Sequence, residues 1–131
     1  MSGATYYDGP QLTGAAIDAN VFCVINPTPT PDTVIMGTAA LAGTAPLAFV
    51  SSVPLDSGQA LYGMQDSGYA IIKCESGYTP TAGAELTSAN DGEAQAASVG
   101  EFIYAIAVEP ASGAAGYVRA RLVATPIVKP A

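Results

Sequence analysis

The chain has 131 residues, of which half are hydrophobic and only 11% are charged. This length allows one modest core, and the net charge of -7 would repel the phosphates of nucleic acids and anionic membrane surfaces. The longest apolar stretch, residues 102–108, is far below the roughly 20 residues that span a bilayer. We therefore expect a single domain with no nucleic-acid or membrane partner.

The first 20 residues are small and polar, and they predict an extended N-terminal arm that carries Tyr6 and Tyr7. The arm has neither a basic opening nor an apolar segment, so no secretory signal is expected and the protein should fold in a cytoplasm. The two tyrosines have two readings. They anchor the arm to a partner, since tyrosine is enriched at interfaces, or they cover their own domain.

From residue 21 onward, short apolar runs alternate with glycine, proline, serine and threonine, and no helical periodicity is sustained. A proline-rich loop at 26–32 and a tight turn at Asn90–Gly92 separate the runs, and one helical turn is allowed at 38–42. Strands are predicted at 21–25, 33–36, 47–50, 59–62, 69–74, 84–87, 101–108 and 116–124. The fold class is therefore all-β, a small barrel or sandwich-like domain over 21–124, followed by an extended, loosely held C-terminal tail at 125–131.

The alternation of side chains predicts which strand faces are buried. In the last strand, one face is apolar and the other carries Tyr117, Arg119, Arg121 and Val123. The buried set is Val118, Ala120, Leu122 and Ala124. In 69–74 we expect Ala70, Ile72 and Cys74 inward and Lys73 outward. The strand at 101–108 is apolar on both faces, which predicts cover on both sides by its own domain or a neighbouring subunit.

The sequence offers little catalytic chemistry. Without a histidine, histidine triads and histidine metal sites are excluded. The two cysteines, Cys23 and Cys74, lie far apart, so they form no zinc knuckle, and a cytoplasm favours buried thiols over a disulfide. No phosphate-binding loop is present. We expect no cofactor and no metal.

Carboxylates are the remaining candidates for chemistry. Five glutamates are scattered at predicted strand ends and turns: Glu75, Glu85, Glu93, Glu101 and Glu109. Solvated surface acids are the favoured reading, while calcium ligation and a two-carboxylate hydrolase stay as alternatives. The chain is therefore predicted not to be an enzyme.

Arg119 and Arg121 are half of all cations and share one face of the last predicted strand. They pair with acids of a neighbouring subunit or with acids of their own chain, and we favour the neighbour. Exposed pairs are worth at most about 1 kcal/mol each, so they would orient an association more than drive it.

Residues 56–123 resemble the head decoration, or capsid cement, proteins of tailed phages. The resemblance rests on the order of five segments, Gly68–Lys73, Thr81–Leu86, Asp91–Ala94, Phe102–Ala111 and Tyr117–Leu122. Residues 1–55, including the proline-rich loop, lie outside it.

This resemblance implies a compact β domain, often trimeric, that docks on the outer surface of the phage head and holds neighbouring units of the major capsid protein together. It implies no catalysis and no cofactor. A different function, a tail or fibre module that binds a host receptor or glycan, is the alternative, because a β fold alone serves either role.

Overall fold

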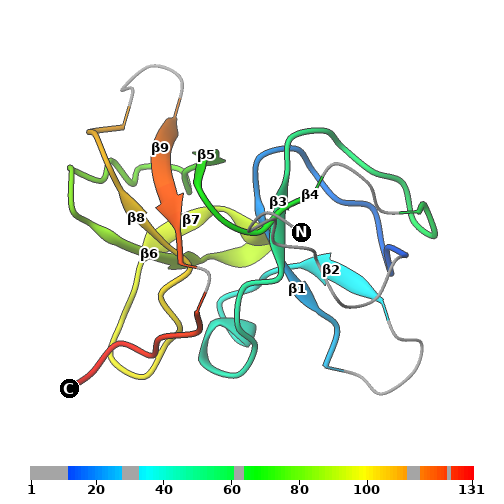
Figure 1. Cartoon of the computed structure of the whole chain (residues 1–131), viewed down its shortest axis with the longest axis horizontal. Coiled ribbons are helices and arrows are strands. Elements are labelled where there is room, and N and C mark those ends of the chain that lie inside the picture. Colours follow the sequence, from blue (N-terminus) through cyan, green and yellow to red (C-terminus); the bar gives the residue numbers. More distant parts are fainter. Residues whose placement is uncertain (1–11, 28–32, 61–63, 112–115, 124) are drawn as a thin grey trace, which may run out of the picture.

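The structure is a computed structural model, and it describes residues 12–27, 33–60, 64–111, 116–123 and 125–131. These residues form two antiparallel sheets that lie beside each other in Figure 1. The four-stranded sheet has the order β2-β1-β3-β4 and the five-stranded sheet the order β5-β9-β8-β6-β7. Within the described ranges the only helices are the single 3-10 turns η1 (Leu41–Gly43) and η2 (Asn90–Gly92). The all-β prediction is confirmed, and the two open sheets make a sandwich-like arrangement, not a closed barrel.

The strands of the four-stranded sheet are β1 (Phe22–Ile25), β2 (Val34–Met36), β3 (Phe49–Ser51) and β4 (Met64–Gln65). The central strand β1 is apolar throughout and is buried on both faces. Phe22 and Val24 belong to the larger hydrophobic cluster, whereas Cys23 belongs to a smaller one together with Val34 and Phe49. Period-two alternation in one strand thus supplies two clusters at once.

The strands of the five-stranded sheet are β5 (Tyr69–Lys73), β6 (Glu85–Ser88), β7 (Ala94–Ala96), β8 (Ala105–Ala107) and β9 (Tyr117–Leu122). β5 and β9 pair over five residues and show the predicted alternation. Ala70 and Ile72 are buried on β5, while Lys73 is exposed. On β9 the buried residues are Val118, Ala120 and Leu122. The predicted faces of both strands are confirmed; Ala124 lies outside the described residues.

One hydrophobic cluster joins the two sheets. It combines Phe22, Val24 and Val50 with residues from every strand of the five-stranded sheet. At its centre the Phe22 and Tyr104 rings meet edge to face, with centroids 5.2 Å apart. The Tyr104 hydroxyl donates a hydrogen bond to the Ala45 carbonyl. The shared cluster is the reason that we keep the single β domain as our prediction.

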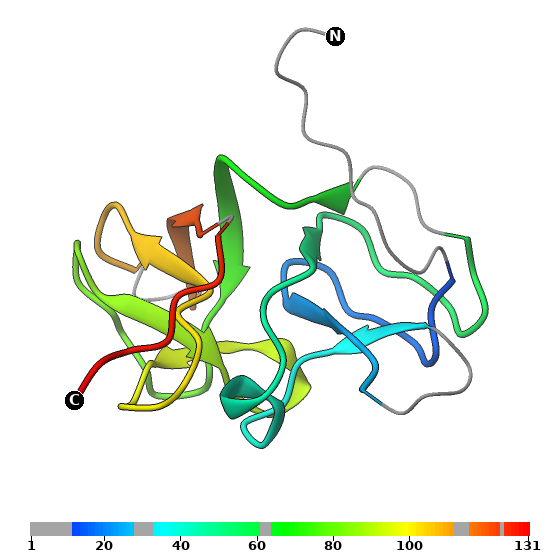
Figure 2. The same cartoon turned by 60° about the horizontal axis from the view of Figure 1, so that its bottom comes forward.

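Residues 12–20, the described part of the predicted N-terminal arm, run beside the four-stranded sheet (Figure 2). Thr13 forms a bridge with Val34, and Ile17 forms one with Leu55. The Ile17 side chain is 1% exposed and belongs to the smaller cluster. This half of the arm is therefore part of the packed domain.

Two strand predictions were placed too broadly. Of 59–62, Ala60 makes a single bridge with Leu12, residues 61 and 62 lie outside the described residues, and the strand β4 begins at Met64. Of 101–108, only Ala105–Ala107 is strand. Its alanines are buried, but Val108 is 36% exposed, so this chain covers one face fully and the other in part. Cover by a neighbouring subunit stays a prediction.

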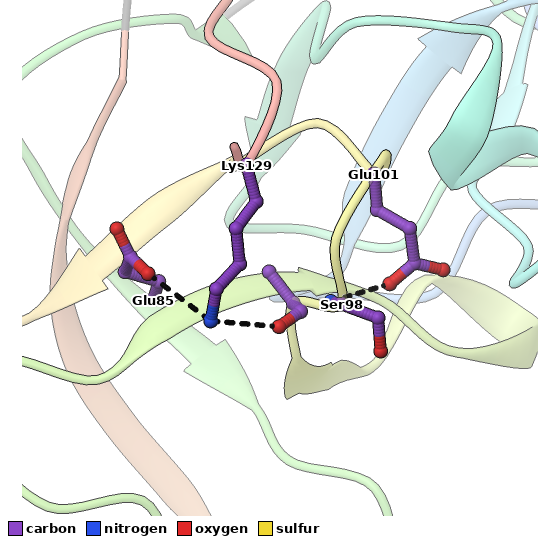
Figure 3. Close-up of polar contacts among 5 residues, drawn as sticks. Glu85, Ser98, Glu101 and Lys129 are labelled. Atoms are coloured by element: carbon purple, nitrogen blue, oxygen red, sulfur yellow. Dashed lines mark hydrogen bonds and ion pairs between the residues drawn. The ribbon is translucent and has the colours of Figure 1, made fainter. Parts of the chain in front are cut away.

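The prediction that the C-terminal tail is loosely held is wrong. Backbone bonds join Gly100 N–H to the Lys129 carbonyl and Ile103 N–H to the Ile127 carbonyl, at 3.0 and 2.8 Å. Figure 3 shows the Lys129 ammonium between the Glu85 carboxylate, 3.3 Å away, and the Ala97 carbonyl, 3.2 Å away. The composition of the tail does not predict these contacts, because the partners lie in the loop 97–103 and in strand β6.

The tight turn predicted at Asn90–Gly92 is observed, and its geometry depends on Gly92. It connects β6 to β7, a strand that the sequence analysis did not predict. Asp91 and Gly92 have φ values of 63° and 74°. A Cβ at Gly92 would lie 2.6 Å from the Phe22 carbonyl oxygen and 2.9 Å from the Val21 Cβ. The turn therefore packs its backbone directly against the start of β1, which couples the two sheets.

Candidate interface on the β5–β9 face

Pairing of β5 with β9 gathers six side chains on the outer side of the five-stranded sheet. Tyr69 lies opposite Arg121, Ile71 opposite Arg119, and Lys73 opposite Tyr117. The six alternate with the buried residues of the same strands, which is why they point outward together. We call this set the β5–β9 face: Tyr69, Ile71, Lys73, Tyr117, Arg119 and Arg121.

The β5–β9 face exposes apolar surface beside its charges. Tyr69 is 53% exposed and Ile71 is 46% exposed. The Arg119 guanidinium carbon lies 4.8 Å from the centre of the Tyr69 ring. Tyr69 and Arg119 are diagonal neighbours across the strand pair, a separation that long side chains bridge. A cation above an aromatic face is worth about 0.5–1 kcal/mol at an exposed site, and here it fixes where the guanidinium lies.

Three of the four cations of this acidic chain lie on the β5–β9 face. Lys73, at one end, is 3.3 Å from the Glu93 carboxylate. Its hydrogen bond to Glu93, together with the carboxylate's charge, raises the pKa of Lys73. Neither arginine forms an ion pair with any residue that the structure describes. The centre of the face is therefore positive in a molecule of net charge -7.

A hollow of about 340 Å³ adjoins the face where β5 approaches the four-stranded sheet. Its six lining residues are Asn20, Ser52, Tyr69, Ala70, Ile71 and Arg119. Asn20 adopts a φ of 62°, and its backbone joins the two sheets: its N–H donates to Ser51 and its carbonyl accepts from Lys73, at 2.7 and 2.8 Å. The hollow thus combines a guanidinium, an amide and a hydroxyl with apolar surface, the composition of a site for a polar or anionic group on a polypeptide.

Of the four predicted interface residues, the structure describes the two arginines and not the two tyrosines. Tyr6 and Tyr7 lie outside the described residues. Arg119 and Arg121 project from one exposed face, as their alternation predicted, and among the described residues no acid of their own chain pairs with them. Their role in an interface stays a prediction. Sequence reasoning missed Tyr69 and Ile71 as members of the face, although the alternation that placed Ala70 and Ile72 inward already implied their outward position.

Two of the predicted surface acids have cationic partners. Glu85 pairs with Lys129 and Glu93 with Lys73, while Glu101 accepts the Ser98 N–H at 2.8 Å (Figure 3). Glu75 and Glu109 are exposed. In the described part of the chain, no three His, Cys, Asp or Glu residues gather in a way that could hold a metal ion. Both cysteines are buried free thiols, as predicted.

The described residues contain no helix long and apolar enough to cross a bilayer. No family of known proteins matches the sequence. No individually curated protein matches it either.

Among solved structures, the chain shares its fold with the head fiber gp8.5 N base in bacteriophage phi29. The similarity has a TM-score of 0.62 at 16% sequence identity, and it covers 89% of this chain and 93% of that chain. At such low identity the likeness concerns the fold. It extends beyond residues 56–123 and includes most of the first half of the chain.

Proposed function

We propose that this protein is a structural component of a tailed-phage head that binds the outer surface of the shell. One observation carries the proposal: nearly the whole chain shares its fold with the base of a phage head fiber. The resemblance of residues 56–123 to head decoration proteins supports the same location, the phage head, on separate grounds. The protein acts by binding, and its partner is the major capsid protein.

The decoration role is our first choice within this proposal. A decoration protein that contacts neighbouring shell subunits adds its binding free energy to the assembled shell and not to the separated subunits. The protein would therefore act as a cement. The exposed β5–β9 face supports this role, because it offers apolar surface and two arginines that form no ion pair with any described residue. We further propose that the protein associates as a homotrimer.

A second candidate follows from the structural neighbour, which is the base of a phage head fiber: the chain is the base of such a fiber. In this role it would attach a receptor- or glycan-binding element to the head, and it would contribute little to the shell's own strength. The two roles share the fold and the shell partner. What distinguishes them is the effect on the particle when the protein is removed.

The test compares shells that carry the protein with shells from a phage in which its gene is disrupted. A cement role predicts that bare shells rupture at lower temperature and under milder osmotic shock, and that added protein restores their resistance. Equal resistance, with the protein still bound to heads, would favour the fiber base. Absence of the protein from purified heads, and no binding to bare shells, would contradict both roles.

A further inference from the structure

Strand β5 is an outer strand of the five-stranded sheet. In an antiparallel pair, alternate residues direct their N–H and C=O groups at the partner strand. Leu122 N–H donates to Gly68 and Cys74 N–H donates to Gly116, so Ala70 and Ile72, between them, direct their backbone groups at β9. The backbone groups of Tyr69, Ile71 and Lys73 therefore point away from the sheet.

The outer edge of β5 is covered at one end, and no described residue pairs with its middle. Lys73 N–H donates to the Asn20 carbonyl at 2.8 Å. No hydrogen bond from any described residue reaches the N–H or C=O of Ile71, and the 340 Å³ hollow lies at this residue. An unpaired strand edge is a template on which an extended peptide can add as a further strand.

The side chains beside this edge select for charge. The Arg119 side chain reaches from β9 to the Tyr69 ring on β5, toward the side on which an added strand would lie. A guanidinium binds a carboxylate through two parallel hydrogen bonds, and Arg119 has no such partner among the described residues. Ile71, 46% exposed, supplies apolar contact for a neighbouring side chain of the same added strand.

We propose that the Ile71 edge of β5 accepts an extended acidic segment of the shell protein as an added strand, with a carboxylate of that segment on Arg119. This inference rests on the proposed function, and it specifies the partner segment and how it binds. Charge complementarity selects the occupant. A second copy that added through its own β5 would bring Tyr69, Ile71 and Lys73, which contain no carboxylate.

The first experiment uses the purified protein and a short capped peptide of alternating valine and glutamate, with a valine–lysine peptide as control. We expect the acidic peptide to slow amide hydrogen exchange at Ile71 and to shift the Tyr69, Ile71 and Arg119 resonances. The lysine peptide should bind more weakly, by up to roughly fivefold, the effect of losing one exposed ion pair. Equal binding of both peptides, or shifts confined to other residues, would overturn the proposal.

The second experiment measures binding to bare shells. Ile71→Pro removes an N–H that the sheet does not use, together with the isoleucine side chain, and proline is tolerated on edge strands. We expect it to weaken binding about tenfold, the effect of losing one hydrogen bond, while Ile71→Val, which keeps the N–H, binds like the native protein. Arg119→Gln should weaken binding by up to roughly fivefold, with the larger loss at low salt, where charges are least screened. A thermal melt establishes that each variant is folded.

The outcomes separate this inference from the proposed function. If folded Ile71→Pro and Arg119→Gln both bind shells normally, the strand-addition proposal is wrong and the head role stands. If the native protein binds no shell, the head role fails, while the peptide titration still tests the edge. Loss of self-association in Ile71→Pro with normal shell binding would assign the edge to a second copy. Oligogalacturonate binding lost in Arg119→Gln but retained in Ile71→Pro would assign the hollow to an acidic sugar. Either result would overturn the proposal.

Discussion

Tyr104 lies at the contact between the two sheets. Its side chain is fully buried, its ring meets Phe22, and its hydroxyl donates to the Ala45 carbonyl across 59 positions of sequence. Tyr104→Phe keeps the ring contact and leaves the buried carbonyl without its partner. We expect a loss of about 1–3 kcal/mol in the free energy of unfolding, measured by urea denaturation. Tyr117→Phe, at a half-exposed position, should change stability by less than about 0.5 kcal/mol. Equal effects would show that the hydrogen bond adds nothing.

The buried thiol of Cys23 gives the protein a dependence on alkaline pH. Burial raises the pKa of Cys23 from 9.0 to about 12, and burial also raises the pKa of Cys74. Above pH 9 the unfolded thiols ionise while the folded ones keep their protons. The unfolded state then binds fewer protons, so the free energy of unfolding falls as pH rises. The stability is present in full below pH 9, and the Cys23 share is lost between pH 9 and about pH 12.

The measurement is urea denaturation at a series of pH values between about 7 and 10. Above pH 9 one thiol contributes up to about 1.4 kcal/mol per pH unit. In Cys23→Ala, the free energy of unfolding should fall less steeply with pH above pH 9, because one of the two thiols no longer ionises in the unfolded state. Below pH 8 its slope against pH should equal that of the native protein. The variant's lower stability at neutral pH, caused by lost packing, does not enter this comparison of slopes. Identical slopes for native and variant protein would contradict the assignment to Cys23.

At the scale of the elements, the β6–β7 turn holds the five-stranded sheet against β1 through Gly92. Gly92→Ala must adopt a φ of 74° and also place a Cβ 2.6 Å from the Phe22 carbonyl oxygen. Gly58 has nearly the same φ, 75°, with no atom within 4 Å of its added Cβ. Gly58→Ala is therefore a matched control that carries the backbone cost, about 1–2 kcal/mol, without the collision.

We expect Gly92→Ala to destabilise the fold by about 1–3 kcal/mol more than Gly58→Ala, because overpacking against backbone has no cheap relief. Thermal or urea unfolding of both variants provides the comparison. If both variants lose the same free energy of unfolding, the close approach of the turn to β1 does not contribute to the packing of the two sheets.

At the scale of the whole molecule, the proposed self-association makes a prediction about heat stability. Binding between folded copies stabilises the folded state by mass action, so the unfolding midpoint should rise with protein concentration. We expect a rise of several degrees between micromolar and hundred-micromolar protein, measured by calorimetry with sedimentation at the same concentrations. A constant midpoint together with a monomer mass would contradict the homotrimer and leave the head role intact.

The sequence by itself determined the all-β class, the burial pattern of β5 and β9, and the exposed position of Arg119 and Arg121. These follow from local rules, since period-two alternation and turn residues act over a few neighbours. Only the tertiary structure decided the partners of these elements. The pairing of Ile71 with Arg119, the contact of Tyr104 with Ala45 and the docking of Lys129 on Glu85 each join distant segments. Many chain paths satisfy the same local pattern, and packing into one shared core selects among them.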